Sequence, residues 1–302
     1  MTIYDLKTMQ ICDIRESTVV ALGFFDGCHA GHQAVFASCR ALAHRMGAKS
    51  AVYTFSSLPK SKDAKCIFSL DERIRAIRKS GIDYLCIENF EQIMNVDAQA
   101  FLEDILCNRL HAIGACCGFN FRFGKGAVAD ASILTSFFEN RGGCVNICDK
   151  ILYGESTLSS SLLRSFIENG ELDALCEVAS PYSIYATVEH GKELGRTIGI
   201  PTINQKIPQD KIVPARGVYI TECEIGEDVY ASVTNVGVRP SVDLNGQENM
   251  ETHIIDFDGS LYGSCVRVNF YKKIRDEKKF DSLDDLRAEV ERNIEMAKNY
   301  FK

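Results

Sequence analysis

GFFDGCHAGH (residues 23–32) connects an apolar run to a segment of helical periodicity. The preceding residues 18–22, TVVAL, are typical of a buried strand. Beyond the motif, apolar side chains recur at helical spacing: Val35, Phe36, Cys39, Leu42, Ala43 and Met46. The motif is therefore predicted to lie at a strand-to-helix turn, with His29 and His32 at the start of the helix.

Strand-like and helix-like segments alternate through the first half of the chain. The predicted strands are KSAVYTF (49–55), DYLCI (83–87), HAIGACC (111–117) and CVNIC (144–148), and the predicted helices are 70–81, with Leu70, Ile74 and Ile77 on one face, 97–110 and 129–143. This alternation favours parallel strands joined by right-handed crossovers, and hence a doubly wound α/β sheet, Rossmann-like in class. Ligands of such sheets bind beyond the carboxyl ends of the strands, where GFFDGCHAGH lies.

The rhythm changes near residue 180. Short alternating segments follow, divided by glycine, proline, asparagine and aspartate: 182–191, 217–225, 229–237, 251–257 and 265–271. They predict an antiparallel barrel or sandwich. A terminal helix is predicted from Ser282, with Leu286, Val290, Ile294 and Ala297 on one face. We therefore expect two domains, 1–180 and 181–302.

Composition limits the classes of partner. The chain has 302 residues and a formal charge of -7, which argues against general binding to nucleic acid or to an anionic membrane. Its start has neither a basic leader nor an apolar core, so we expect a cytoplasmic protein. The thirteen cysteines are odd in number and show no CxxC spacing, which favours reduced, structural thiols over disulfides or zinc. The oligomeric state is not predicted.

The turn at residues 23–32 has the properties of a phosphate site. A helix start offers unpaired N–H groups and a partial positive charge, and Gly27 and Gly31 let the backbone approach a ligand. His29 and His32, spaced by three, can both face the ligand from the first helical turn, where imidazoles stabilise negative charge on a transferring phosphoryl group. The alternative is a packed helix end in which His29 is exposed and His32 is a satisfied polar residue.

Two later segments supply candidate partners. GFNFRFGKG (118–126) is a glycine loop with aromatic faces and the polar side chains Asn120, Arg122 and Lys125, suited to a nucleotide or a flat ring system. LSSSLLRSF (158–166) places hydroxyls at a helix start and an arginine one turn later. The alternatives are a hairpin-like loop whose phenylalanines join the core, and simple capping by the serines.

The segment 186–204, ATVEHGKELGRTIGIPTIN, is the candidate site of the second domain. Its glycines Gly191, Gly195 and Gly199 alternate with the cations Lys192 and Arg196, as in a loop that closes over phosphates. Thr202 and Asn204 then offer oxygen ligands suited to Mg²⁺ bound to ATP. The alternative is an ordinary glycine-rich connection between strands, since the segment is not a Walker A loop.

Glu251 begins the strand of METHIIDFDGSLYG (250–263). A carboxylate near a magnesium–ATP loop can accept the proton of an attacking hydroxyl. The alternative for a single glutamate is a solvated residue at a strand edge.

Together, the motifs of the first domain resemble a known family. GFFDGCHAGH, GFNFRFGKG and SSSLLR, in this order, are similar to the adenylyltransferase module of the prokaryotic bifunctional riboflavin kinase/FMN adenylyltransferases, members of the HxGH nucleotidyltransferase superfamily. The resemblance implies that His29 and His32 stabilise the transition state as the FMN phosphate attacks the α-phosphate of ATP. It further implies nucleotide and phosphate binding by Gly23, Asp26, Gly31, Asn120, Ser160, Ser161 and Arg164.

The second half resembles the riboflavin kinase module of the same family over residues 181 to 300, through GRTIGIPTIN, NVGVRPSV, ETHIIDFDGSLYG and VRVNFYKKIRDEKKFDSLDDL. This implies a six-stranded Greek-key barrel, with Glu251 as the base on the terminal ribityl hydroxyl. The implied ATP-binding residues are Gly191, Lys192, Gly195, Thr202 and Asn204, the last two also binding Mg²⁺. Arg275 is implied to belong to a lid on the flavin side.

The expected function is phosphorylation of riboflavin to FMN, followed by adenylylation of FMN to FAD with release of pyrophosphate. The expected partners are small molecules: riboflavin, FMN and ATP, with Mg²⁺. One departure from the family pattern is Leu58 in TFSSLPKS, where the family commonly has histidine. The alternatives are therefore a riboflavin kinase with a weakened or inactive adenylyltransferase domain, and a regulator that binds flavin or nucleotide.

Overall fold

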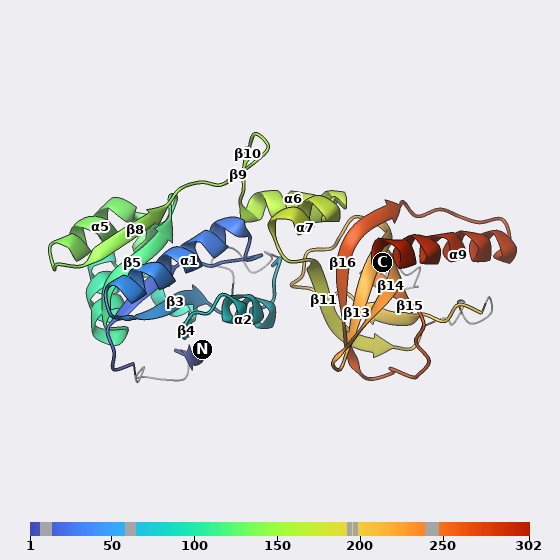
Figure 1. Cartoon of the computed structure of the whole chain (residues 1–302), viewed down its shortest axis with the longest axis horizontal. Coiled ribbons are helices and arrows are strands. Elements are labelled where there is room, and N and C mark those ends of the chain that lie inside the picture. Colours follow the sequence, from blue (N-terminus) through green and yellow to red (C-terminus); the bar gives the residue numbers. More distant parts are fainter. Residues whose placement is uncertain (7–13, 58–64, 192–194, 196–198, 239–247) are drawn as a thin grey trace. The chain divides into compact units, whose positions relative to one another are not determined.

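The chain forms two compact units, residues 1–162 and 163–302 (Figure 1). The computed structural model describes residues 1–6, 14–57, 65–191, 195, 199–238 and 248–302. Strand spacing predicts a domain boundary near residue 180, whereas the structure divides the chain after Leu162. Most of α6 (Ser160–Asn169) and all of α7 (Leu172–Val178) lie between these two positions.

The first unit is built on a parallel sheet of six strands in the order β1-β4-β3-β2-β5-β8. The strands are β1 (Thr2–Asp5), β2 (Thr18–Leu22), β3 (Lys49–Phe55), β4 (Tyr84–Glu88), β5 (Ala112–Gly118) and β8 (Cys144–Cys148). The predicted doubly wound α/β fold is confirmed, and TVVAL, KSAVYTF and CVNIC are strands over the predicted residues. Only β1 is an addition, because its four residues have no clear periodicity.

The strand order creates a switch point between β2 and β5. From β2 the chain proceeds through β3 to β4, and it then crosses back to β5 and β8. The two strands pair in parallel, with Leu22 opposite Cys117, so both end at the same edge of the sheet. GFFDGCHAGH leaves the sheet after β2 and GFNFRFGKG after β5. Because ligands bind at the switch point of such sheets, the topology brings the two motifs to one place.

The helices of this unit are α1 (Ala30–Arg45), α2 (Leu70–Lys79), α3 (Phe90–Ile93), α4 (Ala98–Ala100), the π-helical segment η1 (Phe101–Arg109) and α5 (Ala131–Glu139). The short elements are β6 (Arg122–Phe123), η2 (Lys125–Ala127), β7 (Ala129–Asp130), β9 (Leu152–Tyr153) and β10 (Ser156–Thr157). Helix α1 buries the predicted apolar side chains, Met46 excepted, which caps it.

Helix α2 differs from the prediction. The residues that it buries are Glu72, Arg73 and Ile77, whereas Leu70 and Ile74 are half-buried. Glu72 is buried because it closes a capping box with Ser69 at the helix start. A hydrophobic face alone therefore does not describe this helix.

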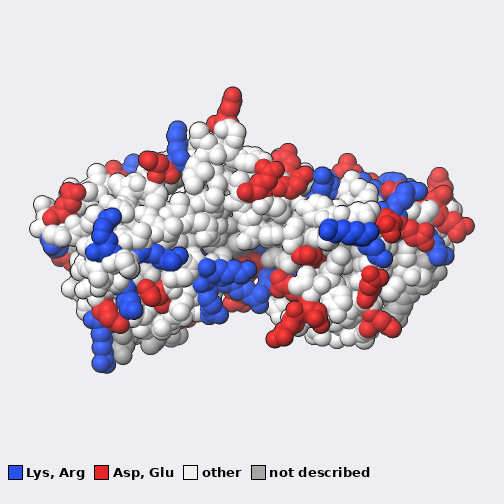
Figure 2. Space-filling model, in the orientation of Figure 1, with Lys and Arg blue, Asp and Glu red and all other residues white. Residues whose placement is uncertain are grey.

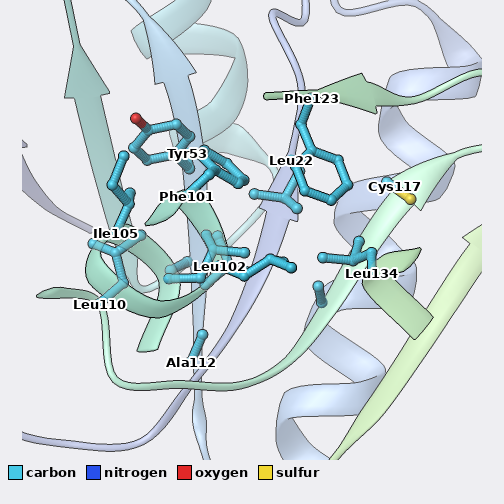
Figure 3. Packing of buried hydrophobic residues seen from close by; sticks show 14 of the residues in the cluster. Leu22, Tyr53, Phe101, Leu102, Ile105, Leu110, Ala112, Cys117, Phe123 and Leu134 are labelled. Atoms are coloured by element: carbon cyan, nitrogen blue, oxygen red, sulfur yellow. The ribbon is translucent and has the colours of Figure 1, made fainter. Parts of the chain in front are cut away.

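The core of the first unit lies beneath the switch point. Figure 3 shows Leu22, Phe101 and Phe123 pointing toward one another, with Tyr53 beside Phe101. The rings of Phe101 and Phe123 are 5.4 Å apart at their centroids, and those of Tyr53 and Phe101 are 5.8 Å apart. The aromatic loop after β5 thus joins the core at one side, as the alternative interpretation of that loop expected.

The second unit is a closed antiparallel barrel in the order β11-β12-β15-β14-β13-β16. Its strands are β11 (Tyr182–Glu189), β12 (Ile203–Lys206), β13 (Gly217–Ile225), β14 (Asp228–Val238), β15 (Glu248–Ile254) and β16 (Cys265–Arg275). Closure removes the sandwich alternative and confirms the barrel of six strands.

Helix α9 (Leu283–Tyr300) packs against β13 and β14 of this barrel. Ser282 caps it as predicted, since its hydroxyl accepts a hydrogen bond from the Asp285 N–H (3.1 Å). Its most buried residues are Glu289, Asn293 and Ala297, while Leu286, Val290 and Ile294 are half-buried. Two of the three side chains deepest in the packed face are therefore polar.

The charged surface residues and the cysteines agree with what the composition predicts. On the face shown in Figure 2, acidic and basic side chains are interspersed over both units. The twelve cysteines within the described ranges are all free thiols. Of the helices in those ranges, none combines the length and the apolar character that a membrane span requires.

Candidate active sites

The turn between β2 and α1 holds the two histidines against each other. His29 is the N-cap of α1, and its Nδ1 accepts a hydrogen bond from the Gly31 N–H (3.1 Å). The rings of His29 and His32 stack with centroids 3.7 Å apart. A Cβ on Gly31 would lie 3.0 Å from the His29 ring, so the glycine of the motif makes room for that imidazole.

Burial keeps both imidazoles neutral. Desolvation lowers the pKa of His29 to about 4, and desolvation together with the neighbouring His29 lowers the pKa of His32 well below its ordinary value. Because Nδ1 of neutral His29 accepts, its proton lies on Nε2, which becomes a hydrogen-bond donor. The Nδ1 of His32 is buried without a partner among the described residues. The pair therefore offers neutral, pre-oriented imidazoles.

The predicted residues of the first site lie around one cavity of about 460 Å³ at the switch point. Its lining includes Gly23, Asp26, His29, Gly31, His32, Asn120, Ser160 and Ser161. The Ser160 hydroxyl donates to the Asp26 carbonyl (2.9 Å), so the start of α6 is attached to the histidine turn. Arg164 lies one turn further along α6 and is not among the lining residues described.

The carboxylate of Asp26 forms hydrogen bonds within the protein. Its carboxylate is 2% exposed and accepts hydrogen bonds from the backbone N–H groups of Ile67 (3.1 Å) and Phe68 (2.9 Å). These contacts fasten the turn to the start of α2. The structure thus places Asp26 at the cavity wall and uses its carboxylate to hold that wall.

Arg73 is a residue that sequence reasoning missed. It is 2% exposed, and its guanidinium donates to the carbonyls of Phe24 (3.2 Å), Phe55 (2.8 Å) and Ser56 (3.2 Å). It also donates to the Thr54 hydroxyl (3.2 Å). Desolvation lowers its pKa, and the nearby Asp26 opposes that shift. Arg73 therefore joins the histidine turn to the end of β3.

A second cavity, of about 370 Å³, adjoins the first and shares five lining residues with it: Leu22, Gly23, Phe55, Phe121 and Arg122. Its walls are mainly aromatic and aliphatic: Tyr53, Phe90, Ile93, Met94, Phe101, Phe121 and Phe123 are among them. The volume falls within the range of about 300–1,000 Å³ typical of ligand pockets. Leu58, the departure from the family pattern, lies outside the described residues.

In the second unit, a cavity of about 250 Å³ opens beside Glu251 on β15. Thr202, Gly195 and Arg275 also line it. Strand pairing places Glu251 opposite Asn204 of β12, so the predicted base and the predicted metal ligand are neighbours across the sheet. The same register places Asn235 of β14 opposite Glu251 on its other side.

The glycine loop lies against the polar side chains that it was predicted to accompany. A Cβ on Gly191 would lie 2.3 Å from Nδ2 of Asn204, and one on Gly195 would lie 2.3 Å from the Ile200 carbonyl. Asn204 is 5% exposed, and its Oδ1 has no hydrogen-bond partner among the described residues. Lys192 lies outside those residues. Close approach of backbone to Asn204 thus requires glycine at residue 191.

Arg275 lines the cavity beside Glu251. Its Nε lies 3.2 Å from a carboxylate oxygen of Glu289 on α9, and the Nζ of Lys278 lies 2.8 Å from the other oxygen. Arg292 also pairs with Glu289. The hydrogen bonds of Lys278 and Arg292 lower the pKa of Glu289 to about 2. One carboxylate therefore fastens the segment after β16 to α9.

The first unit has the features of a nucleotidyltransferase of the HxGH class: a parallel sheet, a switch point, and neutral histidines at a helix start beside serine hydroxyls. The barrel adds a second site, in which a carboxylate stands beside an amide and a glycine loop.

Comparison with known proteins assigns the family. A family model described as FAD synthetase matches residues 12–162, and one described as riboflavin kinase matches residues 178–301. Bifunctional riboflavin kinase/FMN adenylyltransferases of Bacillus subtilis and Escherichia coli K12 are 31% and 32% identical, covering 94% and 95% of this chain and 92% and 94% of their own lengths. The chain belongs to the family of bifunctional riboflavin kinase/FMN adenylyltransferases.

A crystal structure has the same fold over the whole length. It is described as a macrolide-efflux protein from Streptococcus pneumoniae and matches with a TM-score of 0.90 and 29% identity, covering 99% of each chain. The two-unit architecture is therefore found in a solved protein of similar sequence.

Proposed function

We propose that the barrel unit transfers the γ-phosphoryl group of ATP to riboflavin, giving FMN and ADP, and that the first unit joins FMN to the AMP moiety of a second ATP, giving FAD and pyrophosphate. The chain's membership of the bifunctional family over 94% of its length supports both activities. The observation that carries the site assignment is that many of the predicted residues line a separate cavity in each unit, with Asn204 paired to the cavity residue Glu251 across the barrel sheet.

In the kinase site, Glu251 is the residue that receives the proton of the terminal ribityl hydroxyl. It is exposed in the cavity and stands beside Asn204 by strand register. Accepting the proton as the oxygen attacks the phosphorus raises the nucleophilicity of that oxygen. Gly191 and Gly195 let the backbone approach Asn204 and the Ile200 carbonyl closely, which holds the proposed polyphosphate-binding loop against the residues proposed to bind Mg²⁺.

Thr202 and Asn204 are the residues that would hold Mg²⁺. The unpartnered, buried Oδ1 of Asn204 fits this role, because a hard cation takes oxygen ligands and a buried carbonyl oxygen without a partner is costly. The cation, when bound with ATP, neutralises charge on the phosphates.

In the adenylyltransferase site, His29 and His32 act on the α-phosphate of ATP. The Nε2–H of His29 donates a hydrogen bond to a phosphoryl oxygen. This hydrogen bond strengthens as negative charge grows on the oxygen in the transition state. Ser161 and Asn120 line the same cavity and contribute neutral hydrogen bonds to the phosphates and the nucleotide, while the Ser160 hydroxyl, which donates to the Asp26 carbonyl, holds the start of α6 beside them. Arg164, one turn further along α6, stays a predicted phosphate-binding residue.

The aromatic cavity next to this site is the proposed location of the isoalloxazine ring of FMN. Phe55, Phe121 and Phe123 offer faces for a flat ring, and the shared wall at Leu22 and Gly23 leads from the ring to the histidines. A flavin held there presents its phosphate toward the cavity of His29.

One experiment tests the assignment of both sites. Purified protein is incubated with riboflavin, excess ATP and Mg²⁺, and the flavins are separated by chromatography over time. Glu251→Gln should abolish FMN formation while FMN added directly is still converted to FAD, and His29→Ala should have the opposite effect. FMN accumulating without FAD in the unaltered protein would leave only the kinase, and no turnover at all would favour the flavin-binding regulator.

A further inference from the structure

The buried face of α9 contains a polar side chain without a partner. Glu289, Asn293 and Ala297 lie one turn apart along this face. Glu289 is satisfied by Arg275, Lys278 and Arg292. Asn293 is 2% exposed, and its Nδ2 has no hydrogen-bond partner among the described residues. A buried amide donor without an acceptor costs free energy. The Nδ2–H of Asn293 is therefore available to donate a hydrogen bond to a bound ligand.

Asn293 lines the same cavity as Glu251. The polar lining residues Thr202 and Glu251 lie next to β12 and on β15, where ATP and the reacting hydroxyl belong. Helix α9 contributes Leu286, Val290 and Asn293 to the lining, and the apolar Phe280 precedes that helix. A riboflavin molecule whose ribityl terminus reaches Glu251 finds apolar side chains for its ring system on α9, beside Asn293.

The chemistry of a carboxamide matches one edge of that ring system. The pyrimidine part of a flavin presents a carbonyl, an N3–H and a second carbonyl in a row. A carboxamide carries a donor and an acceptor side by side, so it pairs with one carbonyl and the N3–H at once. An aliphatic side chain makes neither bond, and a carboxylate repels the carbonyl oxygens.

We propose that Asn293 determines flavin specificity in the kinase site by hydrogen bonding to the pyrimidine edge of the isoalloxazine ring. This inference rests on the proposed kinase function of the barrel. Asn293 recognises the ring and takes no part in proton or phosphoryl transfer.

The test compares riboflavin with its N3-methyl analogue, which lacks the N3–H, as substrates of the full chain. The unaltered protein should prefer riboflavin in kcat/KM by at least about tenfold, equal to about 1.4 kcal/mol. Asn293→Leu should raise the KM for riboflavin, leave kcat within about twofold, and lose most of the preference over the analogue. Asn299→Leu, at an exposed position of the same helix, is the matched control and should retain the preference.

The outcomes separate the inference from the function on which it rests. If Asn293→Leu discriminates between the two flavins as well as the unaltered protein does, the inference is wrong while the kinase function stands. If the unaltered protein does not phosphorylate riboflavin, the kinase function itself fails. Should Asn293→Leu fold poorly, Asn293→Ser removes the amide with less apolar bulk. Retained selectivity in that variant would overturn the inference equally.

Discussion

Replacing Arg73 by methionine should disable FAD formation and spare FMN formation. Methionine keeps an unbranched apolar stem and removes the guanidinium. Four acceptors then lose their donor, three of them backbone carbonyls and one the Thr54 hydroxyl. The carboxylate of Asp26 also loses a neighbouring positive charge. Of these residues, Phe24, Asp26 and Phe55 line the adenylyltransferase cavity.

The magnitude follows from the burial of Arg73. A buried acceptor left without a donor costs about 1–3 kcal/mol, and removing one partner of a buried charge pair costs about 3–5 kcal/mol. Water entering from the cavity replaces some of the lost hydrogen bonds, so we expect a loss of about 3–5 kcal/mol from the first unit. That is a large share of the 5–15 kcal/mol that stabilises a typical domain.

The assay uses the second unit as an internal control. Urea unfolding monitored by circular dichroism should show an early transition for Arg73→Met, with riboflavin phosphorylation unchanged and FMN adenylylation lost. Arg73→Lys retains a charge with fewer donors and should give an intermediate result. Arg78→Met, at an exposed position of the same helix, should behave as the unaltered protein. The reasoning is refuted if Arg73→Met still makes FAD at the normal rate and unfolds where Arg78→Met does.

Three further predictions concern the site residues. The unfolding temperature of the first unit should rise between pH 4 and pH 6.5. In this range His29 binds a proton when the unit unfolds, because its pKa is about 4 in the folded state and 6.5 in the unfolded state. An equally steep dependence on pH in His29→Gln would contradict this prediction. Gly31→Ala should slow FMN adenylylation by about tenfold or more, since its Cβ displaces the His29 ring, and an unchanged kcat would oppose the assignment. Glu289→Gln should destabilise the barrel by about 1–3 kcal/mol in urea unfolding at pH 7. Because the folded pKa of Glu289 is about 2 against 4.5, this difference should be complete above pH 4.5 and shrink as the pH falls toward 2, so a difference independent of pH would refute it.

Much of the fold was predictable because its signals are local. TVVAL and KSAVYTF form strands over the predicted residues, and Ser282 caps the last helix through its own side chain. Periodicity, capping and turn residues act over one or two turns of chain, so a single sequence contains them. The HxGH turn belongs to the same class, since Gly31 is required by the ring of a residue two positions away.

Periodicity failed where burial is polar. On α2 it predicted a face of Leu70, Ile74 and Ile77, and the structure buries Arg73 there, 49 residues from the Phe24 carbonyl that accepts its hydrogen bond. On α9 it predicted an apolar stripe, and the structure buries Glu289 and Asn293. A charged or amide side chain is normally exposed. Its burial costs desolvation free energy, which hydrogen bonds to partners distant in sequence offset.

The sequence by itself determined the elements, the two fold classes and the chemical identity of the motifs, because hydrophobic period and residue type are properties of short segments. Tertiary structure decided which motifs share a cavity. Strand order brings the ends of β2 and β5 to one edge, and barrel register sets Asn204 beside Glu251. Such neighbours depend on which strands pair and in which register, and long-range burial and chain closure determine that pairing.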